Sequence, residues 1–143
     1  MRLVISSISF ILAALSSWAQ PTISLNGPKQ ARFGLPTVIK TEIVRNSTTG
    51  PVRLVTELPQ GWILRSSDSN LGLINQEGNL VKTVWLNLPL QDTIRHSLLV
   101  IIPENHSGDA VIKAHLEYYS GDNIHHIACS PFAIEVRKYY SRY

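Results

Sequence analysis

Short runs of alternating apolar and polar residues, separated by turn residues, make up most of the chain from position 20 onward. The clearest run is Val52 to Leu58, in which Leu54 and Leu58 share one face and Val55 lies on the other. Residues two apart in a β-strand point to the same side of the sheet. This run therefore predicts a strand with one buried face.

The residues after this strand predict a sharp change of direction. Pro59-Gln60-Gly61 cannot continue a ladder, because proline has no N–H to donate and glycine favours a turn. We therefore expect Trp62, the next residue, to fold back over the edge of the core as a large apolar lid.

The same pattern of alternation and turn residues predicts further strands along the chain. We expect them at residues 22–25, 29–33, 37–45, 63–65, 71–74, 80–88, 93–102, 110–119, 124–129 and 132–138. Ser66 to Asn70 and Asn75 to Asn79 are typical of polar connections. Val38 lies opposite to Ile39 and Ile43, which predicts apolar cover on both sides of the strand at 37–45.

Strands about ten residues apart, with Gly, Pro, Asn and Asp between them and no helical period, predict an all-β fold. The expected architecture is a single immunoglobulin-like β-sandwich of seven or eight antiparallel strands. The alternative is an eight-stranded outer-membrane barrel, for which the terminal aromatic Tyr143 is a weak signal. A barrel needs an apolar outer band, whereas Arg53, Glu57 and Lys113 occupy the outward faces, so the sandwich is favoured.

The first nineteen residues have the features of a secretory signal peptide. Met1-Arg2 is positively charged, Leu3 to Leu15 is mainly apolar, and Ser17-Trp18-Ala19 matches a small-x-small cleavage site. We expect a signal peptide at 1–19, a sandwich domain at 20–138 and a tail at 139–143. No later segment approaches the ~20 apolar residues of a membrane span, so the sequence predicts an exported protein, periplasmic or at the cell surface, without a transmembrane segment.

Charge and cysteine content narrow the function classes. Loss of Arg2 with the signal leaves 12 basic against 10 acidic residues, and the basic ones are scattered, so nucleic acid is not an expected partner. Cys129 is the one cysteine, so no intramolecular disulfide forms. We expect Cys129 and His125 to point toward the core, with the thiol acting as a small hydrophobic group.

Several short motifs resemble those of the conserved-repeat and NPCBM-associated immunoglobulin-like domains of bacterial surface proteins. The matching positions are Ile43-Val44-Arg45-Asn46-Ser47, Gly50, Leu54, Leu58-Pro59-Gln60-Gly61-Trp62, Trp85, Val100-Ile101-Ile102-Pro103 and Gly108. The resemblance implies the fold and a cell-envelope setting, and it implies a spacer, adhesion or assembly role without enzymatic activity. The signal ending in Ala19-Gln20 is also similar to signals of Bacteroidetes exported proteins.

Catalytic and cofactor motifs are missing from the sequence. It contains no Gly-x-Ser-x-Gly elbow, no phosphate-binding glycine loop, no His-Glu-x-x-His and no Cys-x-x-Cys. We therefore expect neither an enzyme nor a bound cofactor.

One group of side chains has metal-ligand chemistry. If Tyr119 pairs with Ile124 across the turn between them, then Glu117 faces His126, and His115 joins them on the outer face of the sheet. Two histidines and a glutamate are ligands that suit Zn²⁺. The spacing is not selective, so we interpret the group as ordinary cross-strand pairs on a solvated face, with the metal site as the alternative.

Two functions are compatible with the sequence. The first is a binding or assembly module that docks onto a protein partner in the cell envelope, through a sheet edge or through a face carrying Val55, Trp85 and the tail. The second is a carbohydrate-binding module in which exposed Trp62 and Trp85 form a stacking platform. Buried tryptophans would remove that platform.

The C-terminal tail combines aromatic and basic residues. Tyrosine and arginine are enriched where interfaces carry their binding energy. We therefore expect the tail to contribute to docking, with a frayed terminus as the alternative. Its candidate binding residues are Arg137, Tyr139, Tyr140, Arg142 and Tyr143.

Overall fold

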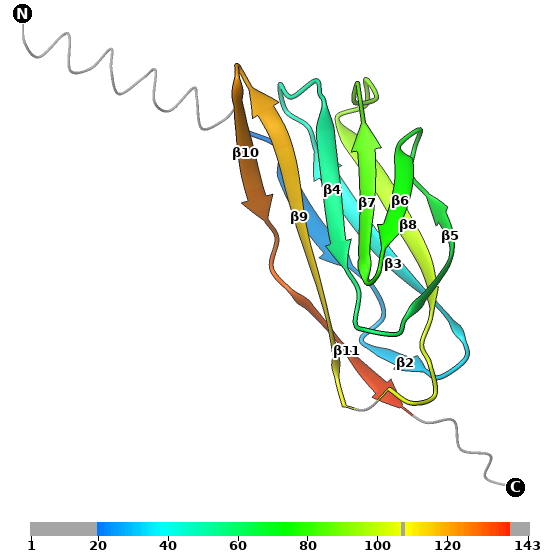
Figure 1. The fold of residues 1–143 in the computed structure, drawn as a ribbon. Coiled ribbons are helices and arrows are strands. Elements are labelled where there is room, and N and C mark those ends of the chain that lie inside the picture. Colours follow the sequence, from blue (N-terminus) through cyan, green and yellow to red (C-terminus); the bar gives the residue numbers. More distant parts are fainter. Residues whose placement is uncertain (1–19, 107, 138–143) are drawn as a thin grey trace, which may run out of the picture.

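All regular structure in the described residues is β-strand. The computed structural model describes residues 20–106 and 108–137 (Figure 1). The predicted signal peptide at 1–19 and the tail at 139–143 lie outside these residues. The strands are β1 (Thr22–Asn26), β2 (Gln30–Arg32), β3 (Pro36–Val44), β4 (Val52–Glu57), β5 (Ile63–Asp68), β6 (Leu73–Glu77), β7 (Leu80–Trp85), β8 (Thr93–Ile101), β9 (Ala110–Ser120), β10 (Asn123–Ala128) and β11 (Phe132–Arg137).

The strands form two sheets that pack face to face. The smaller sheet has the order β1-β3-β8-β5, and the larger has the order β2-β11-β9-β4-β7-β6, with β10 also paired to β9. The β2–β11 pair is parallel, and the other pairs are antiparallel. The predicted all-β sandwich is confirmed. Among the described residues there are more strands than the seven or eight expected, because short runs such as β2 also form ladders.

The two ends of the described chain lie at opposite ends of the sandwich. In Figure 1, β1 begins near the tip of β10, and β11 ends beside β2 at the far end. Strand β9 holds this half of the larger sheet together. One of its edges pairs with β4, and the other pairs first with β11 and then with β10.

The strand expected at 80–88 is too long, because β7 ends at Trp85. Two connections expected to be polar loops are in part strand. The expected loop at Ser66–Asn70 is in part strand, because β5 continues to Asp68 after a register shift between Leu64 and Ser66. The expected turn at Asn75–Asn79 begins too early, since β6 extends to Glu77. Backbone pairing sustains these strands although their side chains are mostly exposed and do not alternate.

Strand β3 is covered on one side only. Ile39 and Ile43 are buried, whereas Val38 on the opposite face is 39% exposed. The expected apolar cover on both sides is therefore wrong, because the outer face of the smaller sheet has no further layer among the described residues.

The core between the sheets consists of two hydrophobic clusters. One contains Ile39, Leu58, Val81 and Leu98, and the other contains residues such as Trp85. On each of four strands, the clusters are separated by one buried polar residue. These residues are Thr41 on β3, Thr56 on β4, Thr83 on β7 and His96 on β8. These four residues lie across the middle of the sandwich, and we call them the polar layer.

The predicted role of Trp62 as a lid on the core is confirmed. Trp62 is 4% exposed and belongs to the first cluster. Its indole N–H donates to Nδ1 of His106 at 3.3 Å, and the two rings meet edge to face.

Replacing Trp62 by alanine should destabilise the protein strongly. Truncation of a buried aromatic side chain costs about 3–5 kcal/mol, because transfer energy is lost and a cavity remains. Urea denaturation followed by circular dichroism measures the loss. Leu71→Ala, at a residue that is 90% exposed, is the matched control and should change stability by less than about 0.5 kcal/mol. A loss below about 1 kcal/mol for Trp62→Ala would contradict the core assignment.

The polar layer contains an uncharged histidine. His96 Nε2 lies 3.0 Å from Thr83 Oγ1, and the His96 ring contacts Trp85 edge to face. His96 Nδ1 is buried without a hydrogen-bond partner among the described residues. Burial lowers the pKa of His96 to about 4, although the nearby Asp68 charge opposes this shift.

Stability should therefore fall as the pH is lowered from about 6.5 to about 4. In this pH range the His96 side chain binds a proton in the unfolded chain but not in the folded protein. The shift in the His96 pKa corresponds to about 3 kcal/mol of folding stability, and this contribution is fully lost below pH 4. The measurement compares denaturation of the wild type and His96→Gln across this range, because the difference between the curves removes the contribution of other groups. Parallel curves would refute the role of His96.

Candidate functional site

The outer face of the larger sheet carries a row of side chains that crosses five strands. The register places Leu73, Val84, Arg53, Glu117 and His126 side by side on β6, β7, β4, β9 and β10. In each strand the residues before and after these positions point to the opposite face of the sheet. The two-residue period of a β-strand therefore places all five on one face. Apolar residues occupy one end of the row and ionisable residues the other.

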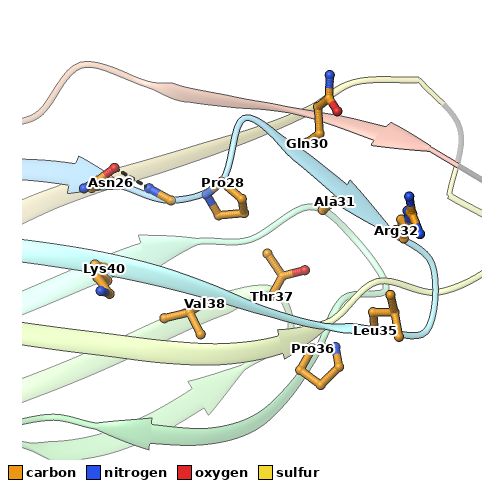
Figure 2. A pocket seen from close by; sticks show the side chains of 11 residues that line it. Asn26, Pro28, Gln30, Ala31, Arg32, Leu35, Pro36, Thr37, Val38 and Lys40 are labelled. Atoms are coloured by element: carbon orange, nitrogen blue, oxygen red, sulfur yellow. Dashed lines mark hydrogen bonds between the residues drawn. The ribbon is translucent and has the colours of Figure 1, made fainter.

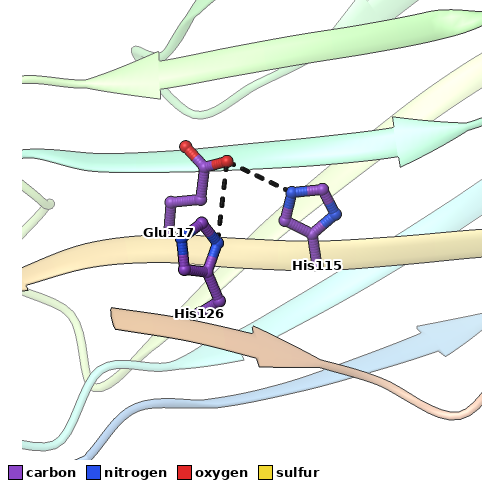
Figure 3. A group of neighbouring side chains, drawn as sticks. All are labelled: His115, Glu117 and His126. Atoms are coloured by element: carbon purple, nitrogen blue, oxygen red, sulfur yellow. Dashed lines mark hydrogen bonds and ion pairs between the residues drawn. The ribbon is translucent and has the colours of Figure 1, made fainter. Parts of the chain in front are cut away.

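Glu117 is the centre of the ionisable end. Arg53 Nε donates to Glu117 Oε2 at 2.6 Å, and Arg53 Nη2 forms an ion pair with the same oxygen. The other carboxylate oxygen, Oε1, lies 3.3 Å from His115 Nε2 and 3.8 Å from His126 Nδ1 (Figure 3). One oxygen of Glu117 thus faces the arginine, and the other faces two imidazoles.

The environment of Glu117 favours its charged form. Burial raises the pKa of the Glu117 carboxyl, but the hydrogen bonds and charges of Arg53 and His115 outweigh burial. The pKa therefore lies below its ordinary value. Near neutral pH the residue is a carboxylate, and both of its oxygens can accept hydrogen bonds.

The predicted strand register around this cluster is confirmed. Tyr119 pairs with Ile124, and Glu117 pairs with His126. The potential ligand atoms of His115, Glu117 and His126 all lie within 4.8 Å of one another. The side chains also form the cross-strand pairs that the sequence analysis favours, so the same geometry serves both interpretations. We call these three residues the His-Glu-His cluster.

Two of the predicted binding residues are not on the surface. Trp85 is 1% exposed, and its indole N–H donates to the carbonyls of Ser69 and Asn70, both at 3.0 Å. Gly72 allows this loop to close, since a Cβ there would lie 2.8 Å from the Trp85 ring. Trp85 is therefore part of the core, and its expected place on a docking face is corrected.

Val55 needs the same correction for a different reason. It lies on the outer face of β4, but it is only 5% exposed. Its cross-strand partners are Lys82 and His115, whose long side chains flank it on both sides. Lysine stems commonly cover apolar surface in this way. With Trp62 and Trp85 both buried, the predicted tryptophan platform for a carbohydrate is absent from the described surface.

The residues predicted at the C-terminus are only partly described. Arg137 is exposed at the end of β11, and its Nε donates to Glu135 Oε1 at 3.0 Å. In the parallel pair, Arg137 lies opposite Arg32 of β2. The other predicted tail residues, Tyr139, Tyr140, Arg142 and Tyr143, lie outside the described residues.

His125 on β10 and Cys129 just after it were both predicted to face inward, and the structure bears this out for only one of them. His125 is exposed and stacks on Tyr118, with ring centroids 5.3 Å apart, so its expected place in the core is wrong. The cause is that β10 pairs with β9 at the border of the sandwich. Cys129 is half-buried against the second cluster, and its thiol donates to the Ala114 carbonyl at 3.5 Å.

Cys129 should react slowly with a thiol reagent in the folded protein. Burial raises the pKa of the Cys129 thiol, more than hydrogen bonds to it lower the pKa, so little reactive thiolate is present at neutral pH. Labelling with a chromogenic disulfide reagent measures the rate, and unfolding in urea should accelerate it by at least about tenfold. Equal rates in the native and unfolded protein would show that the thiol is open to solvent.

A groove between β2 and β3 is a feature that the sequence analysis missed (Figure 2). Its volume is about 630 Å³, and residues 26–28, 30–32, 35–38 and 40 line it. Arg32 and Lys40 are the charged residues of the lining, and Leu35 and Val38 are exposed apolar side chains there. The signal in the sequence is the Asn26-Gly27-Pro28 turn, where the chain leaves one sheet and crosses to the other.

The groove follows a strand edge that has no partner among the described strands. β1 pairs with β3 only from Lys40 to Val44, whereas β8 pairs with all of β3. The stretch from Pro36 to Ile39 therefore has a strand along one edge only. A Cβ on Gly27 would lie 3.4 Å from the Val38 carbonyl oxygen, so this carbonyl points to the side of β3 that β1 leaves unpaired, and the turn at Gly27 lies next to it.

Sequence comparison gives no family assignment. No protein-family model and no curated protein matches the chain. The resemblance to conserved-repeat and NPCBM-associated domains therefore remains a resemblance.

Solved structures share the fold. The chain is similar to a cohesin module of a family 33 glycoside hydrolase from Clostridium perfringens, with 15% identity and a TM-score of 0.64, covering 85% of this chain and 99% of that one. It is similar to a non-cellulosomal cohesin from the archaeon Archaeoglobus fulgidus, with 13% identity, a TM-score of 0.55 and coverage of 81% and 91%.

A third structure with this fold is a DUF4466 family protein from Parabacteroides merdae. The identity is 11% and the TM-score 0.51, and the match covers 81% of this chain but 45% of that one. Identities this low establish the β-sandwich fold alone. Within the described residues, no helix is long and apolar enough to cross a membrane.

Proposed function

We propose that the chain is a non-enzymatic, exported binding module that docks onto a protein partner in the cell envelope. The open edge of β3 in the groove is the observation that carries the proposal. One structure with the same fold is a cohesin module of a glycoside hydrolase, and the proposal extends the role of a module of this kind to this chain. The secretory pattern at 1–19 supports export, to the periplasm or the cell surface.

The occupant of the groove is an extended segment of the partner. An exposed edge presents backbone N–H and C=O groups to an incoming strand, and the main-chain hydrogen bonds provide affinity. In a β-strand, the N–H and C=O of one residue point to the same side, so both groups of Val38 are directed to the side of β3 that β1 leaves unpaired. Leu35 provides an exposed apolar contact beside this edge.

The charge of the lining favours an acidic segment. Arg32 and Lys40 line the groove, and none of its lining residues carries a carboxylate. Complementary charges select the partner and accelerate association more than they add affinity. The predicted tail at 139–143 belongs to the same proposal, because the last described residue of β11, Arg137, lies opposite Arg32, which lines the groove.

Selection from a peptide library tests the groove directly. Random twelve-residue peptides displayed on phage are selected on the mature protein, and binding of the enriched peptides is measured by fluorescence anisotropy. We expect acidic, extended sequences whose affinity falls about tenfold or more with Lys40→Glu, and whose affinity falls as salt is raised. Val38→Pro, which removes the edge N–H, should also abolish binding.

Lys113→Glu is the matched control, because Lys113 is exposed on the outer face of the larger sheet. This variant should bind the selected peptides like the wild type. Enriched peptides that bind all three variants equally, or a library that yields no acidic sequence, would contradict docking at this groove.

A further inference from the structure

We propose that the His-Glu-His cluster is a binding site for Zn²⁺, formed by His115 Nε2, Glu117 Oε1 and His126 Nδ1 and completed by a ligand from outside. The cluster lies on the outer face of the larger sheet on β9 and β10, whereas the groove lies between β2 and β3 (Figures 2 and 3). The inference is therefore independent of the proposed docking function.

The distances are close to those of a metal site. Zn–N and Zn–O bonds of about 2.0–2.2 Å in a tetrahedron place ligand atoms about 3.3–3.5 Å apart. Glu117 Oε1 is already 3.3 Å from His115 Nε2 and 3.8 Å from His126 Nδ1, and the three ligand atoms lie within 4.8 Å of one another. Rotation of the more exposed imidazole, that of His126, can bring the atoms to these distances without a backbone change.

The backbone holds the three ligands in place. His115 and Glu117 are two residues apart on β9, so they share a face, and His126 lies directly opposite Glu117 on β10. The hairpin between these strands is a short turn at residues 121 and 122. A site on paired strands is more rigid than one on a loop, which reduces the ordering cost of binding.

Arg53 fixes the orientation of the carboxylate. It occupies Glu117 Oε2, so Oε1 is directed toward the two histidines. Hydrogen-bonded partners of this kind commonly orient metal ligands. The arginine charge opposes a cation nearby, and this repulsion makes the site weaker than a buried zinc site.

Three protein ligands leave a coordination position open. His115 and His126 are 40% and 62% exposed at their side chains, whereas Glu117 is 15% exposed, so the open position points away from the sheet. Zinc sites with three protein ligands hold water or an incoming ligand in the fourth position. A side chain of another protein molecule can take this position, which would place a metal bridge on the outer face.

Calorimetry with Zn²⁺ tests the site. Mature protein without an affinity tag, treated with EDTA and then dialysed, is titrated with zinc chloride. We expect saturable binding of one equivalent for the wild type. His126→Ala and Glu117→Gln should each weaken binding about tenfold or more, because each removes one ligand.

His125→Ala is the matched control, since His125 is the adjacent residue but is stacked on Tyr118 instead of joining the cluster. This variant should bind Zn²⁺ like the wild type. Zn²⁺ should also raise the melting temperature of the wild type and of His125→Ala, but not that of His126→Ala, because ligand binding to the folded state stabilises it. Circular dichroism confirms that each variant is folded before titration.

Two results would overturn the proposal. One is the absence of saturable Zn²⁺ binding by the wild type, which would leave the cluster as a set of cross-strand polar pairs. The other is equal affinity in the wild type and His126→Ala, which would place the metal at other ligands. Failure of this proposal leaves the groove proposal intact, because the peptide measurements contain no metal and use different residues.

Discussion

The contact between Thr83 and His96 joins the two sheets in the middle of the core. One residue comes from each sheet, and hydrophobic clusters lie on both sides of the pair. A buried polar group costs free energy unless it is hydrogen-bonded, so one relative position of the sheets, the one that keeps this contact, is favoured. The groove between β2 and β3 depends on this packing, because its two strands belong to different sheets.

The sequence was sufficient for features that depend on local period and turn chemistry. The alternation in Val52–Glu57 and the break at Pro59 predicted a strand and the burial of Trp62, and the structure confirms both. The expectation of one buried face holds only in part, because Val55 on the outer face is buried as well. The register of β9 and β10 also followed from the sequence, because a short turn leaves few ways to pair two strands. The His-Glu-His cluster was therefore predictable as a geometry, although its chemistry was not.

Other features depend on contacts between distant segments and could not be predicted. Strand β7 has apolar residues on both faces, so its pattern could not tell whether Trp85 points inward. The structure places Trp85 in the second cluster, and the carbonyls of Ser69 and Asn70, from a distant loop, accept its indole N–H. Val55 is 5% exposed and lies between Lys82 and His115, which come from two other strands. The groove arises because β1 is shorter than β3, and strand ends are the least certain part of a sequence-based assignment.

The arrangement of the first and last described strands determines how the domain responds to mechanical load. β1 begins at one end of the sandwich and β11 finishes at the other, so tension between the chain ends runs along the strands (Figure 1). Strand β11 is held by β9 on one edge and by β2 on the other. Tension along a strand stretches all the hydrogen bonds of its ladders at once, whereas tension across it would open them one after another. A pull applied at these two described ends would therefore load the ladders of β11 in the direction in which they resist best.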